Sequence, residues 1–149
     1  MVRTIDRAIG RIDFGVQLDH PVHQRASFEV WEEDGIVRLV LGNATPIDPW
    51  AMKDILRALN RIDPIGGAPV MVEQEELVRM TPDAKLFLVR ICTHNQRPVA
   101  FMAYDLPDRI QGEFFMRFHK PVFPFRVFSA QDEALGWFTQ FTGAVFVTQ

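Results

Sequence analysis

The pattern of apolar and polar residues predicts a strand–helix–strand unit near the middle of the chain. Residues 70–72 form a short apolar run, and a second apolar run, residues 99–104, follows Pro98. Between them, Thr81-Pro82 marks the start of a helix whose apolar positions recur at helical spacing, namely Ala84, Phe87, Leu88 and Ile91. Two apolar runs bridged by a helix are typical of a parallel βαβ crossover.

The segment before this unit predicts a β-hairpin and a helix. Residues 28–31 and 37–41 are apolar-rich runs that flank Asp34-Gly35, the dipeptide that suits a tight turn needing positive φ at both positions. Asp48-Pro49 then predicts a helix start, with Asp as the N-cap and Pro at the first helical position.

The segment after the unit predicts a third helix over about residues 107–119, a strand over 125–128 and a final helix after Ser129. Helical spacing places these apolar residues inward: Ile110, Phe114, Phe115 and Phe118 on the third helix, and Ala134, Leu135, Phe138 and Phe141 on the fourth. The complete order is β-β-α-β-α-β-α-β-α. This order predicts an α/β fold with a mixed, mostly parallel sheet opened by a hairpin.

The two ends of the chain are less regular. Residues 1–25 form an N-terminal arm, either disordered or paired with a sheet edge, including that of a second subunit. Residues 26–149 are expected to form one domain, and residues 144–147 suit a short edge strand.

Composition narrows the class of protein. The chain has 149 residues, 48% hydrophobic and 23% charged, as in ordinary globular proteins. The net charge of -3 argues against nucleic-acid binding, which needs a basic face. The single cysteine, Cys92, excludes an internal disulfide. No secretory signal and no membrane span are recognised, so a cytoplasmic location is expected.

Three stretches of the sequence resemble STAS-type domains, the fold of bacterial anti-sigma-factor antagonists and of the cytoplasmic tails of sulphate transporters. They are FEVWEEDGIVRLVL, APVMVEQEELVRMTPDAKLFLV and FPFRVFSAQDEALGWF, and the resemblance spans residues 27–141. More narrowly, the chain is similar to small uncharacterised bacterial STAS-like proteins. The resemblance implies a protein-interaction or regulatory module and describes architecture better than activity.

The resemblance also places Thr81 near a regulatory serine. In the antagonists an Asp-Ser-Ser/Thr-Gly sequence precedes the second long helix, and a partner kinase phosphorylates its serine. The matching stretch here is Met80-Thr81-Pro82-Asp83-Ala84, which lacks the paired hydroxyl and the glycine and so argues against that switch. On residue chemistry alone, Thr81 is either an anion-binding position at a helix N-terminus or an ordinary N-cap.

Two further groups of residues are candidates for partner or ligand binding. Glu73, Glu75 and Glu76 follow a predicted parallel strand, where α/β sheets place ligands, and form either a contact surface for a basic partner or a solvated loop. Trp31 lies on the strand face opposite Phe28 and Val30. If no helix covers that face, it marks an exposed patch that Trp50 could join.

No catalytic constellation is found in the sequence. The glycine-rich phosphate loops, the His-Glu-x-x-His motif and the Gly-x-Ser-x-Gly motif are all missing, and no cofactor or metal is expected. His20 with His23 and Cys92 with His94 provide too few ligands or the wrong spacing for a metal site or a dyad.

The function predicted is therefore a non-enzymatic binding module that contacts a protein partner or forms a homodimer. The alternative is a small-molecule or lipid binder with an apolar cavity under the phenylalanine-rich third and fourth helices.

Overall fold

The computed structural model describes residues 28–42, 46–75, 78–91 and 97–142. The predicted N-terminal arm, residues 1–25, and the predicted edge strand, residues 144–147, lie outside these ranges. The elements are β1 (Phe28–Glu33), β2 (Ile36–Leu41), α2 (Pro49–Ile62), β3 (Val70–Gln74), α3 (Pro82–Ile91), β4 (Val99–Met102), α4 (Leu106–Phe114), the π-helical turn η1 (Phe115–His119), β5 (Phe125–Phe128) and α5 (Gln131–Thr142).

The strands form one five-stranded sheet in the order β1-β2-β3-β4-β5. Strands β1 and β2 are antiparallel, and each later neighbour pair is parallel. The hairpin turn has positive φ at both Asp34 and Gly35, as the Asp-Gly signal requires. The predicted fold class and element order are confirmed.

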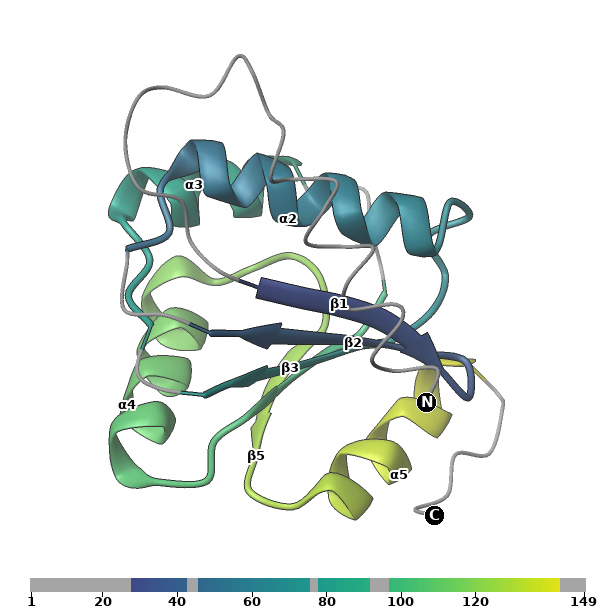
Figure 1. Cartoon of the computed structure of the whole chain (residues 1–149). Coiled ribbons are helices and arrows are strands. Elements are labelled where there is room, and N and C mark those ends of the chain that lie inside the picture. Colours follow the sequence, from purple (N-terminus) through teal and green to yellow (C-terminus); the bar gives the residue numbers. More distant parts are fainter. Residues whose placement is uncertain (1–27, 43–45, 76–77, 92–96, 143–149) are drawn as a thin grey trace.

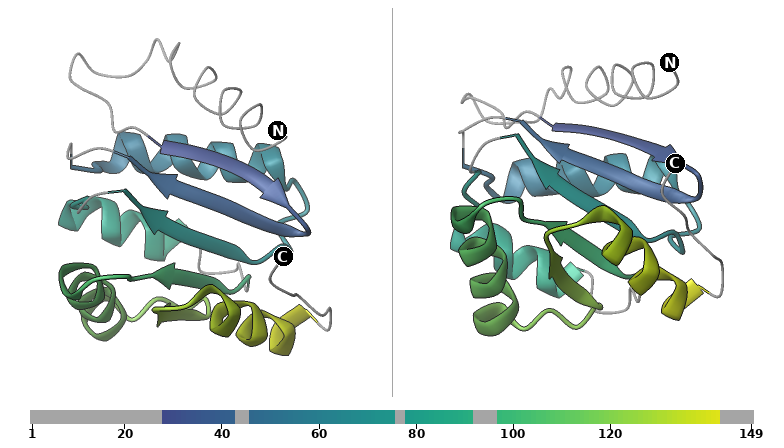
Figure 2. Two further views of the ribbon diagram at one scale, coloured as in Figure 1. Left: turned by 60° about the horizontal axis from the view of Figure 1, so that its bottom comes forward. Right: turned by 90° about the horizontal axis from the view of Figure 1, so that it is seen from below.

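The helices lie on both sides of this sheet. Helices α2 and α3 cover one face, α5 lies on the other, and α4 stands at the carboxyl ends of the parallel strands (Figure 1). Figure 2 shows the same layers from below, where α5 is the helix of the described residues that lies beneath β3 to β5. The two faces of the sheet are therefore covered by different helices.

Local chemistry fixes the start of α2. The Asp48 carboxylate accepts a hydrogen bond from the Ala51 backbone N–H at 2.8 Å, and Pro49 occupies the first helical position. A side-chain N-cap of this kind stabilises a helix by about 1 kcal/mol. The predicted helix start is thus confirmed.

Each face of the sheet has its own apolar core. The core beneath α2 and α3 is built from alternate strand residues such as Val30, Leu39 and Val70, packed against Met52 and Ile55. The core beneath α5 contains Met71, Ala100, Met102, Phe128, Ala134, Leu135, Trp137 and Phe138. Strand residues alternate between the two cores because successive side chains point to opposite faces.

Candidate functional site

Thr81 caps helix α3. Its Oγ1 accepts a hydrogen bond from the Ala84 backbone N–H at 3.2 Å, and its own N–H donates to the Ile47 carbonyl at 2.9 Å. An isolated bridge between Ile47 and Met80 holds the segment beside the start of α2. The geometry is that of the N-cap alternative. A role for Thr81 in partner binding stays a prediction.

The acidic residues after β3 do not act as one group. Glu73 is half-buried, and its Oε2 accepts a hydrogen bond from the Tyr104 hydroxyl at 2.8 Å. Glu75 is exposed, and its backbone N–H donates to the Leu41 carbonyl at 2.8 Å. Glu76 lies outside the described residues. Their predicted role as a contact surface is not tested by this arrangement and stays a prediction.

Tyr104 links Glu73 to the start of α5. Gln131 Nε2 donates to the Tyr104 oxygen at 3.3 Å, and Arg38 Nη1 donates to Gln131 Oε1 at 3.4 Å. Burial raises the pKa of the Tyr104 hydroxyl, and the Glu73 carboxylate raises it further, against a lowering by the Gln131 hydrogen bond. A raised pKa keeps this phenol protonated at neutral pH, so the group is a hydrogen-bond donor rather than a base.

The two tryptophans have different surroundings. Trp31 is only 1% exposed, and its indole N–H donates to Glu33 Oε1 at 3.1 Å. The prediction of an exposed patch at Trp31 required an uncovered strand face, and the burial of this side chain does not meet that condition. Trp50 is partly exposed at the start of α2, with Lys53 Nζ 5.0 Å from its ring centroid. A role for Trp50 in partner binding stays a prediction.

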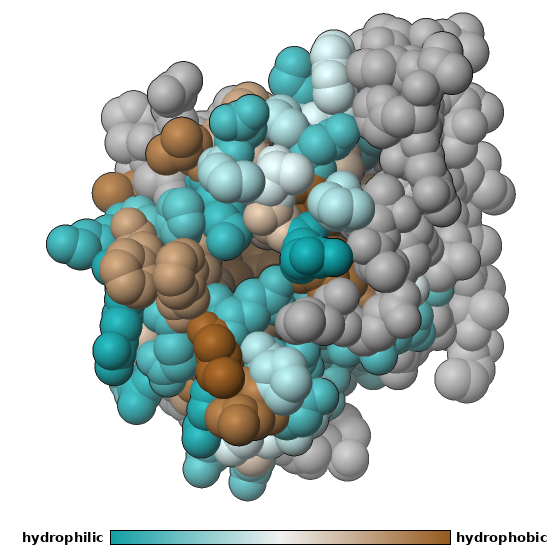
Figure 3. All heavy atoms as spheres, turned by 90° about the vertical axis from the view of Figure 1, so that its left-hand side faces the viewer, coloured by the Kyte–Doolittle hydropathy of each residue, from teal (hydrophilic) through white to brown (hydrophobic). Residues whose placement is uncertain are grey.

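The largest departure from the sequence prediction is on α4. Of the four residues expected to point inward on this helix, only Phe115 is buried. One row along α4 and η1 is exposed instead: Leu106 at 66%, Ile110 at 58%, Phe114 at 47% and Phe118 at 69%. We call these four residues the α4 patch. Figure 3 shows apolar side chains gathered in a band over this end of the molecule.

Gly112 explains why the row faces outward. A Cβ at this position would lie 2.7 Å from Phe101 Cδ2 and 2.8 Å from Val127 Cγ2, so the helix backbone itself packs on the sheet. Asp108 and Phe115 are buried on the same side of the helix as Gly112. The α4 patch lies on the opposite side. A glycine in the middle of a helical segment was the sequence signal for this close approach.

Charged residues flank the α4 patch. Arg109, Glu113 and Arg117 follow one another at intervals of four, and both arginines are exposed. Within the ranges that the structure describes, none of the three forms an ion pair. Their charges are therefore available to a partner that covers the patch.

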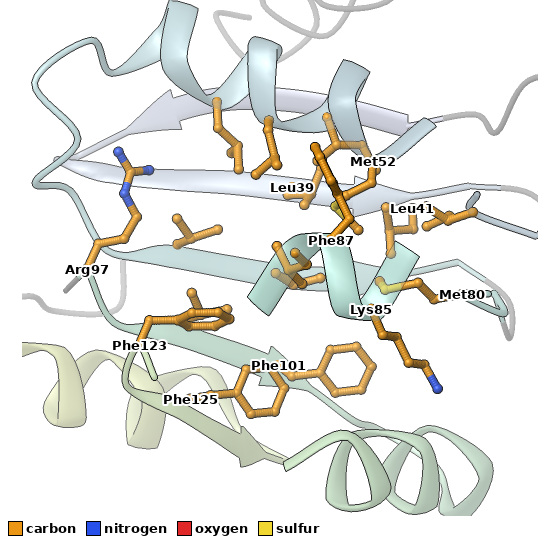
Figure 4. Close-up of a pocket in the computed structure, with 18 of the residues that line it drawn as sticks. Leu39, Leu41, Met52, Met80, Lys85, Phe87, Arg97, Phe101, Phe123 and Phe125 are labelled. Atoms are coloured by element: carbon orange, nitrogen blue, oxygen red, sulfur yellow. The ribbon is translucent and has the colours of Figure 1, made fainter. Parts of the chain in front are cut away.

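A cavity of about 910 Å³ lies between the sheet and helices α2 and α3. Figure 4 shows Phe101, Phe123 and Phe125 along one side of it and Leu39, Leu41, Met52 and Phe87 along the other. The phenylalanines of its wall come from α3, β4, β5 and the segment before β5, with Phe115 from η1. Helix α5 covers the opposite face of the sheet, so a cavity shared by the third and fourth helices was a wrong prediction.

The two ends of the cavity differ in charge. At one end Arg97 Nη2 lies 3.0 Å from Asp63 Oδ2, and Arg97 Nε donates to the Gly66 carbonyl at 3.1 Å. At the other end Lys85 extends toward α4, with its Nζ 5.4 Å from the centroid of the Phe114 ring. Neither cation was predicted as a site residue, because only the fold brings α3, β4 and the segment after α2 to one cavity.

A metal site needs a group of ligating side chains, and a membrane span needs a long apolar helix. Among the described residues, no group of three or more histidine, cysteine, aspartate or glutamate side chains is placed to hold a metal ion. His20, His23, Cys92 and His94 lie outside those residues. Within the described ranges, no helix has the length and apolar character needed to cross a membrane.

Comparison with known proteins gives a family and a structural neighbour. No curated protein matches the sequence. One solved structure, an uncharacterised protein from the DUF3478 family with a SpoIIAA-like fold from Shewanella loihica PV-4, is similar to this chain with 11% sequence identity and a TM-score of 0.49. The match covers 82% of this chain and 99% of that one. The family model of DUF7793, a domain of unknown function, matches residues 30–142, and the chain therefore belongs to this family.

Proposed function

We propose that this protein is a STAS-like protein-interaction module whose docking surface is the α4 patch, and that the patch binds a second copy of the chain. The observation that carries the proposal is the exposure of four large apolar side chains in one row, from Leu106 to Phe118. Contiguous exposed apolar surface of this kind marks interaction sites more strongly than apolar residues that are exposed singly.

The row has the geometry that helix pairing uses. Leu106, Ile110, Phe114 and Phe118 are spaced four residues apart and form a ridge along α4 and η1. Ridges of this spacing pack into the grooves of another helix at a crossing angle of about −50°. A two-fold axis would bring the same ridge from both copies together, so one patch supplies both sides of the interface.

The flanking charges favour a second copy over an unrelated partner. In an antiparallel pair the same flank of both helices meets, so Arg109 of one copy can face Glu113 of the other, and the reverse. This arrangement gives two ion pairs from one row of alternating charge. Such pairs specify orientation and partner more than they add affinity.

Sedimentation velocity over a range of protein concentrations tests the proposal. The wild-type chain is expected to shift from monomer to dimer as concentration rises, and Phe118→Ser to remain monomeric at concentrations where the wild type pairs. Phe141→Ser is the matched control, since Phe141 is also partly exposed but lies on α5. A wild-type chain that stays monomeric, or binds phospholipid vesicles through Phe118 without pairing, would contradict the proposal.

A charge exchange sharpens the same test. Arg109→Glu and Glu113→Arg are each expected to weaken pairing by up to about tenfold, because exposed ion pairs contribute about 0.2–1 kcal/mol each and like charges repel. The double variant Arg109→Glu/Glu113→Arg is expected to regain most of the loss. Additive weakening in the double variant would rule out the antiparallel arrangement.

A further inference from the structure

The cavity beneath α2 and α3 has a mostly apolar lining, and the cations at its two ends have different surroundings. We propose that it binds a single-chain amphipathic carboxylate, with the hydrocarbon chain in the cavity and the carboxylate at Lys85. The proposal does not rest on self-association, although Lys85 lies over Phe114 and the head of the ligand site therefore borders the α4 patch.

The wall of the cavity suits a hydrocarbon chain. Val72 and Phe101 are paired neighbours on β3 and β4, and both side chains face the cavity. Leu56 of α2 and Leu88 of α3, both only partly buried, line it from the helix side. A volume of about 910 Å³ lies within the range of about 300–1,000 Å³ that small-molecule sites occupy, and a mostly apolar lining with few polar groups is their usual composition.

The charge on Arg97 is already compensated. Its guanidinium is buried and bonds to the Asp63 carboxylate at 3.0 Å, which closes the cavity at the end of α2. A second carboxylate there would have to displace Asp63 from a buried pair, and breaking a buried pair is costly. This end therefore suits the tail of a ligand rather than its head.

Lys85 lies at the opposite end without a counter-charge. Its Nζ contacts the Phe114 ring, and no carboxylate in the described part of the chain lies within ion-pair distance of it. The nearby Asp108 carboxylate accepts from Gln74 Nε2 at 2.8 Å, and the same nitrogen donates to Gln111 Oε1 at 2.7 Å. With these polar groups already engaged with one another, the ammonium of Lys85 is the group left to bind an acidic head.

Two other cations line the cavity on the α2 side, and of these two Arg57 has a carboxylate partner. Arg57 Nη1 lies 3.5 Å from Asp54 Oδ1. Lys53 is exposed and lies over the Trp50 ring at 5.0 Å and the Phe87 ring at 6.0 Å. Lys53 is the competing anchor for an acidic head, so the experiment must separate it from Lys85.

Isothermal titration with hexadecanoate and with hexadecanol, each below the concentration at which it aggregates, tests the proposal. We expect one molecule of hexadecanoate to bind per chain, and native mass spectrometry to show the same added mass. Lys85→Met is expected to weaken the binding of hexadecanoate by about tenfold or more, because a charge-assisted contact is lost. The same variant should leave the affinity for hexadecanol unchanged. Lys53→Met removes the competing anchor and should weaken hexadecanoate binding far less than Lys85→Met does.

A cavity-filling variant tests whether the hydrocarbon chain of the ligand lies in the cavity. Val72→Phe places a ring in the middle of the cavity and should weaken the binding of both ligands by at least about tenfold. If Val72→Phe does not fold, as judged by circular dichroism, Leu88→Trp fills the same space from α3. Phe118→Ser, which tests self-association, is expected to keep full binding.

Four outcomes would overturn the proposal. They are no binding of hexadecanoate to the wild type, binding that neither filling variant weakens, an effect of Lys53→Met in place of Lys85→Met, and equal weakening of acid and alcohol by Lys85→Met.

Discussion

Helices α4 and α5 carry apolar rows of similar spacing, but one row is exposed and the other is buried. On α5, Ala134, Leu135 and Phe138 pack under the sheet and leave almost no surface exposed, while Phe141, which was also expected to point inward, is 45% exposed. On α4, the row from Leu106 to Phe118 faces away from the sheet. Helical spacing therefore predicts which residues share a side of a helix, but not which side meets the core.

The side of contact is decided by how closely each helix can approach the sheet. Helix α4 approaches through Gly112, where the absence of a side chain lets the backbone rest against Phe101 and Val127. Helix α5 approaches through large side chains that fill the space themselves, with Phe128 and Trp137 ring centroids 5.5 Å apart. The glycine side of α4 therefore displaces the aromatic side from the core.

Removing one phenylalanine from each helix should show the difference most strongly. Phe138→Ala is expected to lower the free energy of unfolding by about 3–5 kcal/mol, because it leaves a cavity in a closed core. Phe118→Ala should cost about 1 kcal/mol in the monomer, chiefly its stacking on Phe114. Urea unfolding at low protein concentration measures both, and equal losses would mean that the α4 row is buried after all.

Adding one methyl group to each helix should give effects of opposite sign. Gly112→Ala is expected to destabilise the protein by about 1–3 kcal/mol, because its Cβ would overlap Phe101 and Val127. Gly136→Ala on α5 meets nothing within 4 Å and should stabilise it by about 0.5–1 kcal/mol through helix propensity. Thermal unfolding separates the two. A neutral Gly112→Ala would show that α4 does not pack through its backbone.

A smaller effect is expected from His119 at the end of η1. Burial lowers the pKa of His119, and the charge of Lys85 lowers it further. The unfolded chain therefore binds the proton more tightly, so this residue makes the folded state less stable as the pH falls through about 6.5. The unfolding free energy of the wild type minus that of His119→Gln should therefore become lower as the pH falls. If acidification instead stabilised the wild type relative to His119→Gln, the pKa of His119 would not be lowered in the folded protein.

The sequence predicted the parts of the fold that depend on local chemistry. Asp34-Gly35, Asp48-Pro49 and Thr81-Pro82 each specify a turn or a helix start through their own backbone, and each is found where expected. Of the two alternatives given for Thr81, the hydrogen bond to its side chain is that of the N-cap. These features need only residues that are neighbours in the chain.

The parts that were missed depend on distant contacts. The burial of Trp31 and the orientation of α4 are set by what packs on each surface, which periodicity does not contain. Likewise the cavity draws Leu56, Val72, Lys85 and Arg97 from four separate segments. No spacing in the sequence could bring them together, although the glycine at position 112 did mark the unusual contact of α4.

Cysteine cross-linking across the proposed two-fold axis tests the central claim most directly. Ile110→Cys in a Cys92→Ser background leaves one cysteine, in the middle of the α4 patch. A disulfide forms only where Cα atoms come within about 4.4–6.8 Å, so pairing through α4 should give a covalent dimer under mild oxidation. Phe141→Cys in the same background should remain monomeric. Monomer from Ile110→Cys, or equal cross-linking of the two variants, would show that the α4 patch is not the surface that joins two copies.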